Sequence, residues 1–131
     1  MILDTSYLIN LIQRQQPAFE KGVSLFESRT VRRVPVPVLF ELWYGVEFLD
    51  DEDRRRRLRN ALMGYPVVPL DESMSRRAAE LLARADRAAG GSSGIEANDA
   101  YVAAAADRFD EPVLTANAAD FEALGVAVEG F

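Results

Sequence analysis

Short apolar runs alternate with longer helical stretches along the whole chain, and this alternation restricts the folds open to it. The apolar runs are short and mostly β-branched, which predicts buried strands. Helices between successive strands require those strands to run parallel, with helices covering both faces of the sheet. The sequence therefore predicts an α/β fold with about five strands, at Met1–Leu3, Val34–Val36, Val67–Leu70, Val113–Thr115 and Val126–Glu129.

The helical stretches carry apolar residues at helical spacing, with helix start and stop residues at their ends. A proline is expected in the first turn of two of them, because proline lacks only an N–H that has no partner there. The alanine-rich stretch 96–108 predicts a helix against which other elements pack closely. Predicted helices cover 5–13, 18–28, 38–49, a segment that starts at 50–53 and continues through 54–59, 72–89, 96–108 and 118–123.

Cysteine and histidine are both absent from the 131 residues, and this limits the chemistry more than any other feature of the composition. Disulfides, thiolate or imidazole metal ligands and a histidine base are all excluded. A metal ion in this chain would need oxygen ligands, which favours magnesium or manganese.

The net charge of −6 argues against a protein coated in positive charge. Fourteen of the fifteen cationic side chains are arginine, and Lys21 is the only lysine. Adaptation to a salty cytoplasm and a GC-rich genome both account for this composition, and the sequence does not separate them. The start of the chain lacks the features of a signal peptide, and no apolar run reaches membrane-span length, so a cytoplasmic protein is expected.

Acidic side chains follow the predicted strands at several points. Asp4 ends the first strand, and Asp120 follows the fourth; Glu41 and Asp99 lie near the starts of two helices. Because ligands of parallel sheets bind beyond the carboxyl ends of the strands, these acids are expected to meet at one rim. Carboxylates brought together repel one another unless a cation or a proton neutralises them. A divalent ion held there could polarise a phosphodiester.

Four fragments carry a family resemblance: MILDTSYLI, VLFELWYGV, IEANDAYVAAAA and VLTANAADF, in this order. With them the chain resembles a PIN-domain ribonuclease of the VapC toxin type, from a type II toxin–antitoxin system. The resemblance implies a single three-layer α/β/α PIN domain over residues 1–131. It also implies magnesium- or manganese-dependent RNA cleavage and an antitoxin partner.

The resemblance also assigns roles to individual residues. The core acids would be Asp4, Glu41 and Asp99, with Asp4 and Asp99 nearest the metal. Asp120 would be the fourth acid, and Asn117 a neutral ligand to water or phosphate. Ser6 and Thr115 would orient carboxylates through their hydroxyl groups.

Other interpretations of these residues remain open. Asp4 could cap the first helix through the N–H of Ser6 or Tyr7. Asp71 could be the phosphorylated residue of a receiver-like signalling domain, although such a domain needs a lysine after its last strand. A haloacid-dehalogenase phosphatase would have an aspartate where Ser6 stands. A PIN-like fold kept only as a binding module is the remaining alternative.

Two surface features also allow two interpretations each. The arginines Arg54–Arg57 and Arg59 are either a solvated face paired with Asp50–Asp53 or part of an RNA-binding surface. The helix over 38–49 has two apolar stripes. The second stripe, Phe40, Tyr44 and Phe48, is either buried within the monomer or a surface for a homodimer or an antitoxin.

Overall fold

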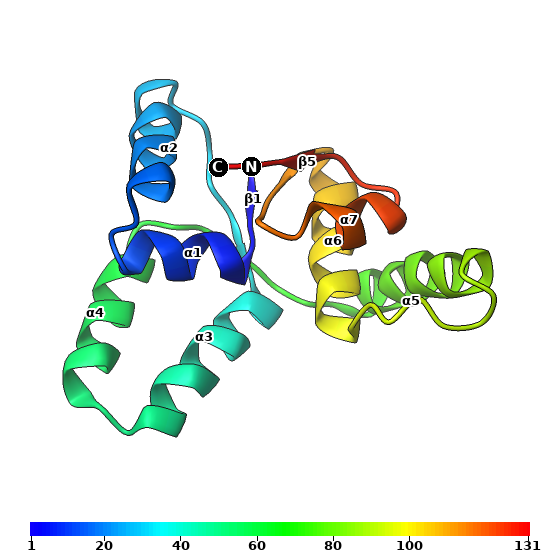
Figure 1. Ribbon diagram of the computed structural model, residues 1–131, viewed down its shortest axis with the longest axis horizontal. Coiled ribbons are helices and arrows are strands. Elements are labelled where there is room, and N and C mark those ends of the chain that lie inside the picture. Colours follow the sequence, from blue (N-terminus) through cyan, green and yellow to red (C-terminus); the bar gives the residue numbers. More distant parts are fainter.

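The computed structural model describes residues 1–131, and its elements alternate as the sequence predicts (Figure 1). All five predicted strands and all seven predicted helices form. In chain order they are β1 (Ile2–Leu3), α1 (Thr5–Ile12), α2 (Gln16–Glu27), β2 (Val34–Pro35), α3 (Val36–Leu49), α4 (Glu52–Leu62), β3 (Val67–Val68), α5 (Glu72–Ala88), α6 (Ala97–Phe109), β4 (Val113–Leu114), α7 (Ala118–Ala123) and β5 (Val128–Glu129).

The strands form one parallel arrangement in the order β3-β2-β1-β4-β5. Pairing is parallel between β1 and β4, between β4 and β5, and between β2 and β3. A parallel bridge between Ile2 and Arg33 joins the two parts, supported by the Leu3 N–H bond to the Arg33 carbonyl at 2.9 Å. The chain order therefore reverses between β1 and β4, and such a reversal opens a crevice beyond the strand ends.

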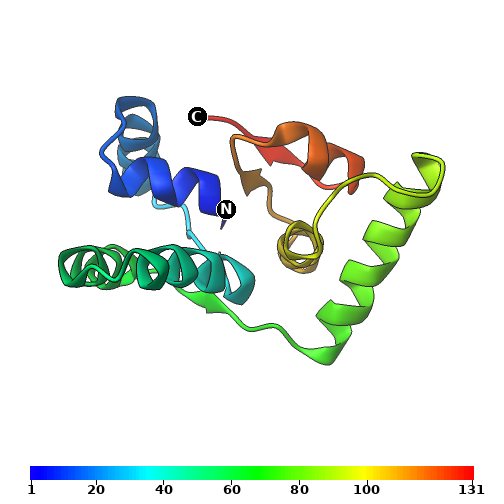
Figure 2. The same cartoon turned by 60° about the horizontal axis from the view of Figure 1, so that its bottom comes forward.

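Helices cover both faces of this sheet, so the fold has the predicted three α/β/α layers. Helices α1 to α4 lie on one side of β1, and α5, α6 and α7 lie on the other (Figure 1). The turned view shows the same separation, with α6 seen nearly end-on (Figure 2).

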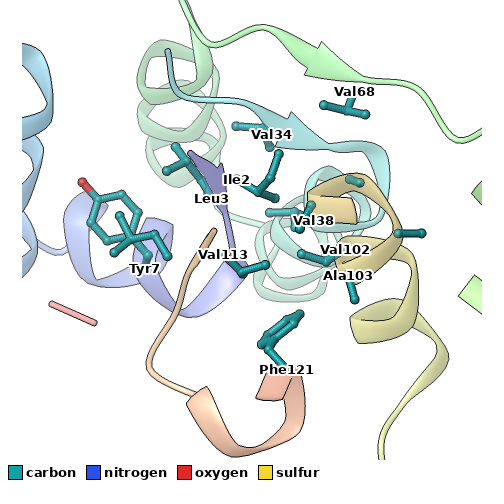
Figure 3. Packing of buried hydrophobic residues seen from close by; sticks show 14 of the residues in the cluster. Ile2, Leu3, Tyr7, Val34, Val38, Val68, Val102, Ala103, Val113 and Phe121 are labelled. Carbon is teal, nitrogen blue, oxygen red and sulfur yellow. The ribbon is translucent and has the colours of Figure 1, made fainter. Parts of the chain in front are cut away.

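The core lies on both faces of β1 and β4. Ile2 and Leu3 are fully buried and point to opposite faces, as neighbouring strand residues must. Figure 3 shows Ile2 close to Val38 and Val102, with Phe121 pointing toward this group from α7. In α6, every residue from Val102 to Ala106 is buried, so the small alanine side chains allow the close packing that the sequence predicts.

Two helices, α2 and α3, begin two residues earlier than expected, at positions where a proline in the first turn is tolerated. Helix α3 begins at Val36, two residues before the predicted start, so Val36 is helical rather than part of a strand. Helix α2 begins at Gln16, one residue before Pro17. In both helices the proline occupies the second helical position, where its missing N–H leaves no hydrogen bond unmade.

The two apolar stripes of α3 have different environments. Leu42 is buried, and Leu39, Trp43 and Val46 pack against the core. The second stripe is solvent-exposed: Phe40, Tyr44 and Phe48 are 64%, 62% and 77% exposed. Burial of both stripes within the monomer is therefore wrong. None of the helices is both long enough and apolar enough to cross a lipid bilayer.

Candidate active site

Asp4 lies where β1 ends and α1 begins, at the point where the strand order reverses. Only 6% of the surface of Asp4 is exposed to solvent. Although it occupies the N-cap position, its side chain makes no capping hydrogen bond, so the capping interpretation is wrong. Its Oδ2 instead accepts bonds from Thr115 Oγ1 at 2.7 Å and Ser6 Oγ at 3.1 Å. Both bonds use the same oxygen, which leaves Oδ1 without a protein partner.

The two hydroxyl groups are themselves held by the backbone of the loop after β4. Ser6 Oγ accepts the Ala116 N–H at 3.0 Å, and Thr115 Oγ1 accepts the Asn117 N–H at 2.9 Å. Each hydroxyl therefore has its proton free to donate to Asp4. This network fixes the orientation of a buried carboxylate across the junction of β1 and β4.

Glu41 lies in the second turn of α3 and is half-buried. Asn98 Nδ2, from the first turn of α6, donates to its Oε1 at 3.2 Å. Burial raises the pKa of Glu41, a change that Asn98 and Thr5 oppose and the negative charges of Asp4 and Glu96 reinforce. Thr5 Oγ1 is buried without a hydrogen-bond partner of normal geometry, although it is near enough to Glu41 to lower that pKa.

Asp99 occupies the third position of α6, and its carboxylate is repelled by the negative charges of all the other acids of the site. Burial raises its pKa to about 6, and the charges of Asp4, Glu41, Asp120 and Glu96 add to this effect. Four distant segments therefore place acidic groups close enough to interact through space. The last of them, Asp120 in the first turn of α7, accepts a bond from Asn117 Nδ2 at 2.7 Å.

Two members of this group were not singled out from the sequence. Glu96 immediately precedes α6, and its spacing of three from Asp99 places both on one side of the first turn. That spacing is a signal present in the sequence. Asn98 is different, because its bond to Glu41 depends on how α3 and α6 pack, and no local pattern indicates it.

No cationic side chain of the protein neutralises the negative charge of this acidic group. None of Asp4, Glu41, Glu96, Asp99 and Asp120 takes part in an ion pair with arginine or lysine. No three acidic side chains stand close enough to enclose a metal ion by themselves. The donor set is nevertheless all oxygen, and it fits an ion that binds one or two carboxylates and keeps several waters, as magnesium does.

Comparison with known proteins identifies the fold family. The PIN domain family model matches residues 1–126. This chain belongs to the PIN domain family. No curated protein matches its sequence.

Solved structures share this fold at low sequence identity. The VapBC2 structure from Rickettsia felis, bound to a promoter DNA fragment, has a TM-score of 0.81 at 18% identity and covers 98% of this chain and 96% of that chain. DNA-bound VapBC from Salmonella typhimurium has a TM-score of 0.79 at 22% identity, covering 98% and 96%. FitAcB from Neisseria gonorrhoeae has a TM-score of 0.73 at 26% identity, covering 97% and 94%.

Asp71 has a structural role in this PIN domain. Its side chain caps α5 by accepting the Met74 N–H at 2.9 Å, and it pairs with Arg108 at 2.8 Å. These donors lower the pKa of Asp71. A carboxylate occupied in this way is not a free phosphoacceptor, so the receiver-like hypothesis fails.

The raised pKa of Asp99 makes the stability of this PIN domain depend on pH. The folded pKa of about 6 exceeds 3.8, the ordinary pKa of an aspartate, so the folded state binds the proton more tightly. Stability should therefore fall as pH rises from about 4 to 6. The exposed part of the side chain limits the loss to about 1–2 kcal/mol.

The check is urea unfolding of wild type and Asp99→Asn in EDTA at several pH values. The stability advantage of the variant should grow between pH 4.5 and 7. Asp110→Asn changes an acid at the other end of the same helix, and its stability should vary with pH as that of wild type does. An advantage of Asp99→Asn that stays constant over this range would contradict the assignment.

Proposed function

We propose that this PIN domain is a magnesium-dependent endoribonuclease that acts in the cytoplasm as the toxin of a toxin–antitoxin pair. The observation that carries the proposal is the uncompensated group of acids where the strand order reverses. A carboxylate held by two hydroxyls, buried and unused as a helix cap, has no structural task that explains it. A divalent cation would neutralise the mutual repulsion of these acids.

Within this proposal the residues have distinct tasks. Asp4 and Asp99 are the metal ligands, with manganese able to replace magnesium. When bound, the ion would polarise the phosphodiester and make water more acidic. Thr115 and Ser6 keep Asp4 in its orientation through bonds of 2.7 and 3.1 Å to Oδ2. Their supporting role is to keep Oδ1 directed away from the hydroxyl network.

The remaining acids complete the site. Glu41 is held by Asn98, and its burial favours a carboxyl that can take up a proton. Asp120 is the fourth acid, and its bond to Asn117 at 2.7 Å makes the two side chains act together. Asn117 then offers its amide to water or to a phosphate oxygen. Glu96 adds negative charge at the rim.

The test of this function is incubation of purified protein with total RNA in magnesium, in manganese and in EDTA, followed by mapping of the cleaved ends. Internal cleavage that requires the divalent ion is the expected result. Intact RNA in all three conditions would contradict the proposal and favour a PIN fold kept as a binding module.

The exposed aromatic stripe on α3 suits binding of a protein partner, which supports the toxin assignment. The solved structures with similar folds include a toxin–antitoxin complex from Klebsiella pneumoniae and VapBC-1 from nontypeable Haemophilus influenzae. The aromatic stripe of Phe40, Tyr44 and Phe48 forms a column with ring centroids 6.2 and 6.3 Å apart. Exposed aromatic side chains in contact with one another are typical of interfaces. We propose that this stripe forms a homodimer and that an antitoxin covers the acidic site.

Dimer formation through this stripe predicts that Tyr44→Ser weakens association. Loss of a central aromatic contact should raise the dimer dissociation constant at least about tenfold. Light scattering across a wide concentration range measures the change, with Phe26→Ser on α2, which is also strongly exposed, as control. A wild-type protein that stays monomeric at every concentration would rule out the dimer.

A further inference from the structure

The arginine run of α4 separates into paired and unpaired members. Arg55 bonds to Glu47 at 2.9 Å, Asp50 at 2.6 Å and Glu52 at 3.3 Å. The neighbouring arginines each take one acid: Arg54 pairs with Asp51 and Arg56 with Asp53. Arg57 and Arg59 form no ion pair. The interpretation as a solvated, paired face therefore holds for the start of the run and fails at its end.

Arg57 lines a groove that leads to the acidic site. A cavity of about 270 Å³ lies between α1, α3 and α4, and its walls include Glu41 at the acidic site and Arg57 on α4. Apolar side chains such as Ile9, Ile12 and Val46 line the space between them. One surface therefore joins an acid of the site, an apolar wall and a cation without a protein partner.

A second cavity continues this groove beyond Arg57. It has a volume of about 570 Å³, shares Ile12, Gln13 and Arg57 with the first, and adds Arg14 and Asn60. Arg14 also forms no ion pair. The groove therefore extends from Glu41 along the apolar wall to a polar end. That end holds the two unpaired guanidinium groups of Arg57 and Arg14 and the side-chain amides of Gln13 and Asn60.

The backbone conformation at Arg14 would favour glycine over arginine if stability alone decided the residue. Its φ of +56° is left-handed, and the Gln15 N–H bonds to the Asn10 carbonyl at 2.9 Å, which completes a helix C-terminal motif. Glycine is the usual residue at this position because it adopts left-handed φ without steric cost. Substitution by glycine therefore removes the guanidinium without threatening the fold.

We propose that Arg57 and Arg14 bind backbone phosphates of a single-stranded RNA beside the acidic site. The inference rests on the proposed function and specifies how its substrate is held. A chain with net charge −6 and an acidic site repels RNA, so binding requires local cations that no protein carboxylate already neutralises. The apolar wall suits a ribose or base face, and the amides of Gln13 and Asn60 can donate to phosphate oxygens.

The test measures binding of a fluorescein-labelled single-stranded RNA to the full chain by fluorescence anisotropy in EDTA, which removes the divalent ion that the proposed cleavage requires. Arg57→Gln and Arg14→Gly are compared with Arg59→Gln, an unpaired arginine of the same helix that lines neither cavity. Each groove variant should lose about fivefold in affinity at 0.1 M salt and lower the salt slope by roughly 0.7. Arg59→Gln should match wild type, and Arg14→Gly should melt no lower than wild type.

The outcomes separate this inference from the proposed function. If wild type cleaves RNA in magnesium while both groove variants bind it as wild type does, this inference fails and the function stands. If the groove variants bind RNA more weakly but wild type never cleaves it, the function fails and the inference stands. A fluorescein-labelled acidic peptide is measured in the same way. If the groove variants lose affinity for this peptide and not for RNA, the groove takes a protein partner and the inference is overturned.

Discussion

Asp99→Asn is expected to reduce RNA cleavage by about 100- to 1000-fold, the loss typical when one group that stabilises transition-state charge is removed. The same substitution should leave the protein without metal as stable as wild type or more stable. It removes a charge that burial and four neighbouring acids all disfavour, as the raised pKa of Asp99 shows. A loss of activity without a loss of stability separates a functional acid from a structural one.

The control for this prediction is Asp110→Asn, which makes the same chemical change at the end of α6. Asp110 has a φ of +51°, a conformation that asparagine tolerates, and forms no ion pair. A cleavage assay and a melting curve in EDTA are recorded for each protein. Cleavage by Asp99→Asn at the rate of Asp110→Asn would remove Asp99 from the site.

The largest effect on stability is expected from Phe121→Ala. Phe121 is fully buried, and its truncation should cost about 3–5 kcal/mol of unfolding free energy. Because Phe121 follows Asp120 in α7, the variant should also loosen the fourth acid. Urea unfolding measures the loss, and Phe26→Ala, at a position 71% exposed, should cost less than about 0.5 kcal/mol. Similar losses for the two variants would contradict the packing of α7.

The sequence predicts the elements of this fold because each carries a local signal. Apolar β-branched runs and helical periodicity can be identified from the local sequence alone. The alanine content of α6 likewise indicates, without knowledge of its neighbours, that other elements pack closely against it. The strand order β3-β2-β1-β4-β5 has no such signal, because periodicity identifies strands without naming their neighbours. Helices α2 and α3 each begin two residues before the predicted start, because proline fits at the second helical position as well as at the first.

Asp4 shows why the site could be only partly predicted. An aspartate between a strand and a helix can be a helix cap or an active-site residue, and the local sequence looks the same in the two cases. The deciding partner, Thr115, lies 111 positions away and meets Asp4 only when β1 pairs with β4. Arg55 is a similar case, since its bond to Glu47 depends on the angle between α3 and α4.

The central claim is that the acids of this site hold a divalent cation, and a magnesium titration of the melting temperature tests it most directly. Wild type, Asp4→Asn and Asp110→Asn are each melted in EDTA and in increasing magnesium. Binding to the folded state alone should raise the melting temperature of wild type and of Asp110→Asn steadily. Asp4→Asn, which keeps the buried position but loses the ligand charge, should gain much less. Equal gains for all three proteins, or none in wild type, would contradict the claim.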